Sequence, residues 1–165
     1  MMGAIECGAD SVFFGVGIRD RRSHSANNVQ PEDLAEIVRS GRQHGVKTYL
    51  TLNIVLYQED IEPANRALDA AKAAGVDAVI ASDMAAIMYC RQIGMEVHIS
   101  TQLSISNADA LKFYAQFADV VVLARELSMK EIAEIREKTP VGLELEMFVH
   151  GAMCVSYSGR CLLSN

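Results

Sequence analysis

The sequence has few cysteines, no long apolar run and no excess of basic residues. Its four cysteines are Cys7, Cys90, Cys154 and Cys161. A set so small and so unevenly spaced excludes the disulfide framework of a small secreted protein. These cysteines are therefore expected to be thiols or metal ligands.

Signals for membrane insertion and secretion are also missing from the sequence. No apolar stretch approaches the roughly 20 residues that a membrane-spanning helix needs, and no basic segment followed by an apolar one opens the chain. The net charge is −6, so no positive field covers the whole surface to attract nucleic acid. We expect a cytoplasmic protein without a membrane partner, in which any RNA contact is local.

The composition fits one folded core. Of the 165 residues, 50% are hydrophobic and 22% are charged, which is too apolar for a disordered chain. We predict a single partial domain over residues 1–165. The first residues read as the end of a helix that stops at Gly8, and the last residues directly follow a cluster of Gly, Cys and Ser. Truncation at both ends is expected.

One unit repeats along the chain, namely an amphipathic helix, a Gly or Asp turn and a short β-branched run. The predicted strands are residues 11–15, 46–53, 77–82, 96–101, 119–124 and 143–149, and the predicted helices are residues 31–44, 60–74, 84–93, 107–117 and 128–138. Such alternation gives a parallel sheet, which is either open and doubly wound or closed into a (β/α) barrel. The stretch at residues 14–17 is not the glycine-rich phosphate loop that would favour the open sheet.

The faces of the strands favour the barrel. Side chains alternate across a strand, so Glu144, Glu146 and His150 are predicted to share one polar face. Two other predicted strands also have a polar face, formed in one by Glu96, His98, Ser100 and Gln102 and in the other by Lys47, Tyr49, Thr51 and Asn53. The open end of a barrel lumen suits such faces, whereas strands inside an open parallel sheet are apolar on both sides. The alternative is that these side chains lie on exposed edge strands.

The most specific feature is the segment at residues 146–165. It closely resembles the signature of the collagenase-like peptidases, peptidase family U32. The matching positions are Glu146, Phe148, Gly151, Ala152, Met153, Cys154, Gly159, Cys161 and Ser164. The stretches His98–Gln102, 123–128 and 8–15 are similar to further motifs of the family, so the resemblance covers nearly the whole chain.

The resemblance implies an incomplete parallel (β/α) TIM-like barrel of the α/β class. Family members usually begin with a strand that carries a Leu-Ala-Pro-Ala-Gly motif, which has no counterpart before Gly8, and they continue past Asn165. About six of the eight strands of the barrel are therefore expected here.

Two of the cysteines are candidate metal ligands. Cys154 and Cys161 follow a predicted strand end, and soft sulfur ligands suit an iron–sulfur cluster or zinc, although two reduced loop cysteines fit the spacing equally well. Relatives that hydroxylate RNA or serve ubiquinone synthesis hold a 4Fe–4S centre with four cysteines, and only Cys154 and Cys161 match that set. The resemblance thus implies a cluster in the intact protein. Cys7 and Cys90 are expected in packing roles.

The candidate catalytic residues are Glu146, His150 and His98, as acid and base or as substrate ligands. A Cys154 nucleophile with either histidine as its base is an alternative, as are solvated or structural roles for all of them. The sequence has neither a Gly-x-Ser-x-Gly elbow nor a His-Glu-x-x-His helix. The candidate substrate-binding residues are Gln102, Asn53, Arg125 and Arg22, the last in a short basic loop that either contacts RNA phosphates or is simply solvated.

Three functions remain open at this point. The sequences of residues 125–128 and 156–161 resemble those of the branch of the family linked to tRNA uridine hydroxylation. This resemblance implies an RNA-modifying enzyme or its component. The second hypothesis is a metal- or thiol-dependent protease that acts on collagen-like or unfolded protein. The third is an inactive barrel fragment. The expected partner is tRNA or a peptide substrate, and exposed strand edges predict a homo-oligomer.

Overall fold

The computed structural model describes residues 1–16 and 29–151, and its chain divides into two compact units, Met1–Glu96 and Val97–Asn165. The first unit contains α1 (Met2–Glu6), β1 (Ser11–Gly15), η1 (Pro31–Asp33), α2 (Leu34–Gln43), β2 (Lys47–Leu52), η2 (Gln58–Asp60), α3 (Ile61–Ala74), β3 (Ala78–Ala81) and α4 (Met84–Ile93). Strand β4 (Glu96–Ile99) begins at the boundary. The second unit continues with η3 (Thr101–Leu103), α5 (Ala108–Tyr114), β5 (Val120–Val122), α6 (Met129–Glu137) and β6 (Glu144–Glu146).

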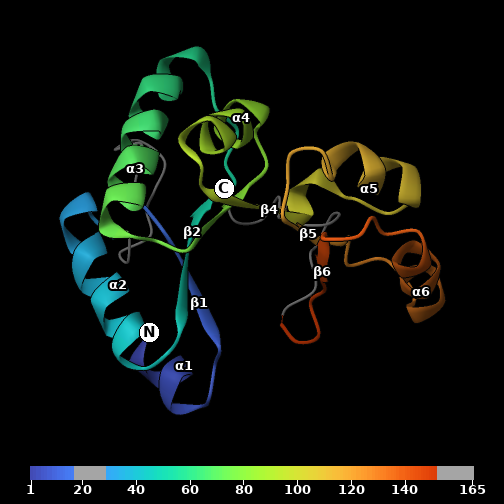
Figure 1. Cartoon of the computed structure of the whole chain (residues 1–165), viewed down its shortest axis with the longest axis horizontal. Helices are drawn as coiled ribbons and strands as arrows, with labels where there is room; N and C mark the ends of the chain where they lie inside the picture. Colours follow the sequence, from blue (N-terminus) through green and yellow to red (C-terminus); the bar gives the residue numbers. More distant parts are fainter. Residues whose placement is uncertain (17–28, 152–165) are drawn as a thin grey trace. The chain divides into compact units, whose positions relative to one another are not determined.

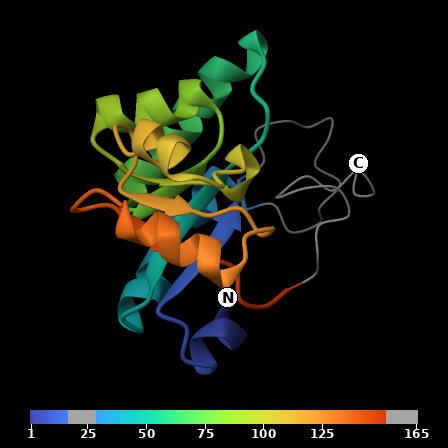
Figure 2. The ribbon, with the colours of Figure 1, turned by 90° about the vertical axis from the view of Figure 1, so that its right-hand side faces the viewer.

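The strands of each unit pair in parallel and in chain order. In the first unit β1 pairs with β2 and β2 with β3, with Phe13 opposite Tyr49 and Thr51 opposite Ile80. In the second unit β4 pairs with β5 and β5 with β6. Each connection between successive strands includes a helix (Figures 1 and 2). The predicted architecture, an incomplete parallel (β/α) barrel with six strands, is confirmed.

The core of the first unit lies between its sheet and helices α2, α3 and α4. Burial alternates along β2, where Thr48, Leu50 and Leu52 are buried while Lys47 is exposed. The buried face is covered by α2, and α3 packs against α2 and α4 (Figure 1). The prediction that β2 has one apolar and one polar face is therefore confirmed.

Two aspartates join neighbouring strands at their amino ends. The Asp77 carboxylate accepts hydrogen bonds from the backbone N–H and the hydroxyl of Thr48, at 2.7 and 3.0 Å, and the Asp119 carboxylate accepts one from the Val97 N–H at 2.9 Å. In both pairs the aspartate N–H donates back to the carbonyl of the same partner at 2.9 Å. A (β/α) barrel keeps stabilising contacts at this end and its chemistry at the other, so these aspartates are fold residues.

Five of the six strands are shorter than predicted, and in β4 and β6 the difference changes the position of site residues. The strand predicted at residues 96–101 ends at Ile99, because the Ser100 hydroxyl caps the 3₁₀ turn η3 by accepting a hydrogen bond from the Gln102 N–H at 3.3 Å. The strand predicted at residues 143–149 spans only Glu144–Glu146. Gln102 and His150 therefore lie beyond the strand ends, and their predicted places on strand faces are wrong.

Candidate active site at the carboxyl ends of β4, β5 and β6

The candidate site lies in the second unit, on the face of its sheet that corresponds to the barrel lumen. Its central pair is His98 on β4 and Glu146 at the end of β6, with Nδ1 and Oε1 separated by 3.8 Å. This distance is within ion-pair range and is longer than a hydrogen bond. The structure thus brings together two of the three residues that the sequence indicated as catalytic.

The register of the sheet explains why these two residues meet. His98 is paired with Val120, and Val120 with Glu144, so Glu144 is the residue of β6 that stands in register with His98. In an eight-stranded barrel with a shear of eight, successive strands are staggered by about one residue, and alternate strands fill each layer of the lumen. Over the two steps from β4 to β6, this stagger brings Glu146 level with His98. The pair therefore belongs to one layer of side chains on the lumen face.

The two members of the pair differ in their access to solvent. The His98 side chain is 1% exposed and the Glu146 side chain is 46% exposed. The imidazole therefore forms part of the base of the site, and the carboxylate faces open space. A substrate at this end of the sheet would meet Glu146 first.

The loop that follows β4 places buried polar side chains close to His98 in the chain. Ser100 and Thr101 are both buried. Ser104, at the end of η3, has a left-handed backbone with φ of 50°, and it is the one non-glycine residue with positive φ among the described residues. Such a conformation costs a non-glycine residue free energy, and it bends the chain sharply between η3 and Ile105. The Ala124 N–H then donates to the Ile105 carbonyl at 3.0 Å, which ties this loop to the end of β5.

Arg125 follows the end of β5 and Phe148 follows the end of β6, and only Arg125 was among the predicted site residues. The Arg125 guanidinium lies over the Phe148 ring, with Cζ 3.8 Å from the ring centroid. The backbone below them is fixed, because the Leu123 N–H donates to the Glu146 carbonyl at 2.9 Å. Sequence reasoning missed Phe148 as a site residue because it counted the odd and even positions of a strand that ends before it. The sequence signal that could have indicated Phe148 was its place in the family signature.

The other predicted site residues lie outside strands β4, β5 and β6. His150 is exposed and follows the end of β6. Gln102 is half-buried in η3. Asn53 follows the end of β2 in the first unit and is half-buried there. Arg22, Cys154 and Cys161 lie outside the described residues, so their predicted roles stay predictions.

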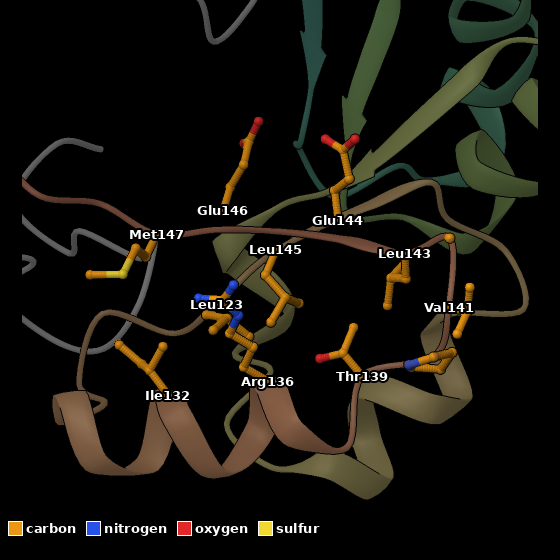
Figure 3. A pocket seen from close by; sticks show the side chains of 12 residues that line it. Leu123, Ile132, Arg136, Thr139, Val141, Leu143, Glu144, Leu145, Glu146 and Met147 are labelled. Carbon is orange, nitrogen blue, oxygen red and sulfur yellow. The ribbon is translucent and has the colours of Figure 1, made fainter.

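A pocket of about 630 Å³ lies on the opposite face of β6. It is lined by Leu143, Leu145 and Met147 from the β6 segment and by Ile132 and Arg136 of α6. Figure 3 shows these side chains in the space between the strand and the helix, whereas Glu144 and Glu146 point away from it. The pocket also touches Glu144 and Glu146, but the side chains of these two residues point away from the space between β6 and α6.

The two described cysteines do not provide a metal site. Cys90 is fully buried in α4, and desolvation by burial raises the pKa of its thiol to about 12. Cys7 is exposed at the end of α1, so its expected packing role is wrong. Within residues 1–16 and 29–151, no group of three or more His, Cys, Asp or Glu side chains is arranged to hold a metal ion. Cys90 therefore does not have the character of a cluster ligand, which must be a thiolate.

Cys90 is therefore expected to resist alkylation. A pKa raised from 9.0 to about 12 lowers the thiolate fraction near neutral pH about a thousandfold. Peptide mapping after brief treatment of the native protein with iodoacetamide at pH 8 should find Cys7 modified and Cys90 unmodified. Treatment in denaturant is the control and should modify both. Equal labelling of the two in the native protein would contradict the packing role of Cys90.

None of the helices in the described part of the chain has the length and apolar character required to cross a membrane.

Comparison with known proteins identifies the relatives of the chain. The model of the family described as "Peptidase family U32" matches residues 1–165. A "Collagenase" of Porphyromonas gingivalis is 52% identical over 99% of the chain, and the "tRNA hydroxylation protein P1" of Bacillus subtilis is 44% identical over 98% of it. The chain spans 42% and 38% of the lengths of these relatives.

A solved structure supports the fold. "The Structure of the U32 Peptidase Mk0906" superposes with a TM-score of 0.66 at 16% sequence identity, and the match covers 84% of this chain and 60% of that one. At this identity the likeness concerns the fold alone. It agrees with the assignment of the six strands to an incomplete barrel.

Proposed function

The chain belongs to peptidase family U32, and from this premise we propose that the intact protein takes part in the hydroxylation of uridine in tRNA. The observation that carries the proposal is the His98–Glu146 pair, which lies at the carboxyl ends of parallel strands, where barrel enzymes place their chemistry. The 44% identity to a relative named for tRNA hydroxylation supports this substrate class. The proposal places the protein in the cytoplasm, with tRNA as its partner.

Within this proposal Glu146 is the catalytic residue and His98 is a positioning residue. Glu146 is accessible, and its carboxylate can accept a proton from the reacting base and return it. His98 is buried next to it, so the imidazole can hold the carboxylate in a fixed direction. The separation of 3.8 Å is compatible with this role, because catalytic contacts often tighten only when substrate binds.

A 4Fe–4S cluster is part of the proposal for the intact protein, with Cys154 and Cys161 as two of its ligands. Such a cluster would supply electron transfer. Of the described cysteines, Cys90 does not fit it, since it is a buried thiol with a raised pKa. The acid–base role of Glu146 does not depend on the cluster.

Proteolysis is the second candidate function. It is favoured by the 52% identity to a relative named Collagenase. Peptide hydrolysis requires an activated nucleophile or a metal-bound water, and the motifs most often associated with these, the Gly-x-Ser-x-Gly elbow and the His-Glu-x-x-His helix, are absent from the sequence. We therefore rank it behind hydroxylation.

Deletion of the gene separates the two functions. Mass spectrometry of digested tRNA should show that the hydroxylated uridine present in the parent strain is lost in the deletion strain and restored by the full-length gene. The purified full-length protein should leave gelatin intact. Unchanged tRNA in the deletion strain, together with gelatin cleavage by the purified protein, would replace the first function with the second.

A further inference from the structure

The Arg125–Phe148 pair has features of a binding surface. The guanidinium covers one side of the ring at 3.8 Å, and Phe148 as a residue is still 45% exposed. The residues on either side of Phe148 in sequence, Met147 and Val149, are also exposed apolar side chains. Phe148 and Val149 are exposed apolar residues at the rim of the candidate site, and such residues indicate contact with a ligand. The exposed cation–π pair itself contributes only about 0.5–1 kcal/mol to stability.

Charge restricts what this surface can bind. Acidic side chains outnumber basic ones in the described part of the second unit, and Glu144 and Glu146 are exposed on β6 below the pair. A track for the phosphate backbone needs several lysines or arginines, and this part of the unit does not offer one. A flat partner that stacks and carries no charge of its own fits better. An unpaired nucleobase is such a partner, because every base has a π face that stacks on aromatic rings and on arginine planes.

We propose that Arg125 and Phe148 form the stacking platform on which an unpaired base of the RNA substrate rests, at the edge of the site that contains Glu146. The inference rests on the proposed function and adds the element that holds the base. The base lies on the exposed part of the arginine–phenylalanine stack. Stacking tolerates any base, so the platform supplies affinity for an unpaired nucleotide and leaves its identity to other groups.

The test uses the full-length protein and an RNA stem-loop with 2-aminopurine at one loop position, and a fully paired duplex of the same length serves as the control RNA. Wild-type protein should bind the stem-loop and quench its fluorescence, because the base stacks on the platform. Phe148→Ala should weaken binding about 5- to 150-fold and abolish the quenching, while Phe148→Trp retains both. Phe113→Ala, which removes a phenylalanine of α5 that is 53% exposed, should bind like wild type.

Arg125→Lys distinguishes stacking from simple attraction of charge. Lysine keeps the positive charge and lacks the planar guanidinium, so a platform predicts that Arg125→Lys loses affinity and quenching nearly as Arg125→Ala does. Wild-type affinity and quenching in Phe148→Ala or in Arg125→Lys would overturn the proposal. If hydroxylated uridine in tRNA depends on the gene and Phe148→Ala restores it fully, the platform is wrong and the proposed function stands. If the wild-type protein binds no RNA, both fail.

Discussion

Replacing Glu146 by glutamine is expected to lower the rate of uridine hydroxylation by about 100- to 10,000-fold, the range that a positioned acid–base group contributes. Glutamine keeps the length of the side chain and an acceptor oxygen, but it takes up no proton near neutral pH. Substrate affinity should change little, so the loss should appear in kcat. The measurements are the content of hydroxylated uridine in tRNA of a deletion strain that expresses the variant and the single-turnover rate of the purified full-length protein.

Glu144→Gln is the matched control for this prediction. Glu144 is on the same strand and the same face and is also exposed, but it is the residue in register with His98 and not the one that contacts it. Its replacement should change the rate by less than about threefold, and both variants should unfold within about 0.5 kcal/mol of wild type. Equal losses in the two variants would attribute the effect to the negative charge of the lumen, and full activity in Glu146→Gln would end the catalytic assignment.

The role of His98 is tested by combining its replacement with that of Glu146. If the imidazole acts only by positioning the carboxylate, His98→Gln combined with Glu146→Gln should be no slower than Glu146→Gln alone, because residues that act as a unit are not additive. His98→Gln alone should also lower kcat with little change in KM, because the Glu146 carboxylate is no longer held in one direction. A merely structural role would lower the amount of folded protein and leave the kcat of the folded fraction unchanged.

The sequence predicted the architecture because its elements have clear periods. The alternating polar and apolar positions of residues 47–53 appear in the structure as the alternating burial of β2. Helix starts were predicted almost as well where a capping side chain is present, as at Asn107, whose Oδ1 accepts a hydrogen bond from the Ala110 N–H at 2.9 Å. These features depend on neighbours within a few residues, which a sequence displays directly.

The site was only partly predictable because it depends on contacts between strands. Alternation placed His98 and Glu146 each on a polar face, but their contact arises from the stagger of β4 and β6 across β5, which no local pattern encodes. The same pattern extended the last strand too far and so assigned His150 to the face of Glu146. Phe148 was overlooked for the same reason, although its contact with Arg125 joins the ends of two strands.

Replacing Gly41 by alanine is expected to destabilise the protein by about 1–3 kcal/mol, the range for overpacking a close contact. In most helices the same change is stabilising, by roughly 1 kcal/mol. Gly41 is buried in α2, where a Cβ atom would lie 2.7 Å from Thr48 Cγ2 and 2.8 Å from the Val46 carbonyl oxygen. Helix α2 and strand β2 can therefore approach each other closely because residue 41 has no side chain. Thermal and urea unfolding of the full-length protein measure the effect.

Two further variants identify the cause of that loss. Gly15→Ala is the control, because a Cβ atom at Gly15 would meet nothing within 4 Å, and its unfolding should stay close to wild type. Adding Thr48→Ser to Gly41→Ala removes Cγ2 while the hydroxyl can still donate to Asp77, so it should recover part of the stability. The rest should remain lost, because the Val46 carbonyl belongs to the backbone and cannot move without shifting the start of β2. Complete recovery would mean that Thr48 alone sets the distance between α2 and the sheet.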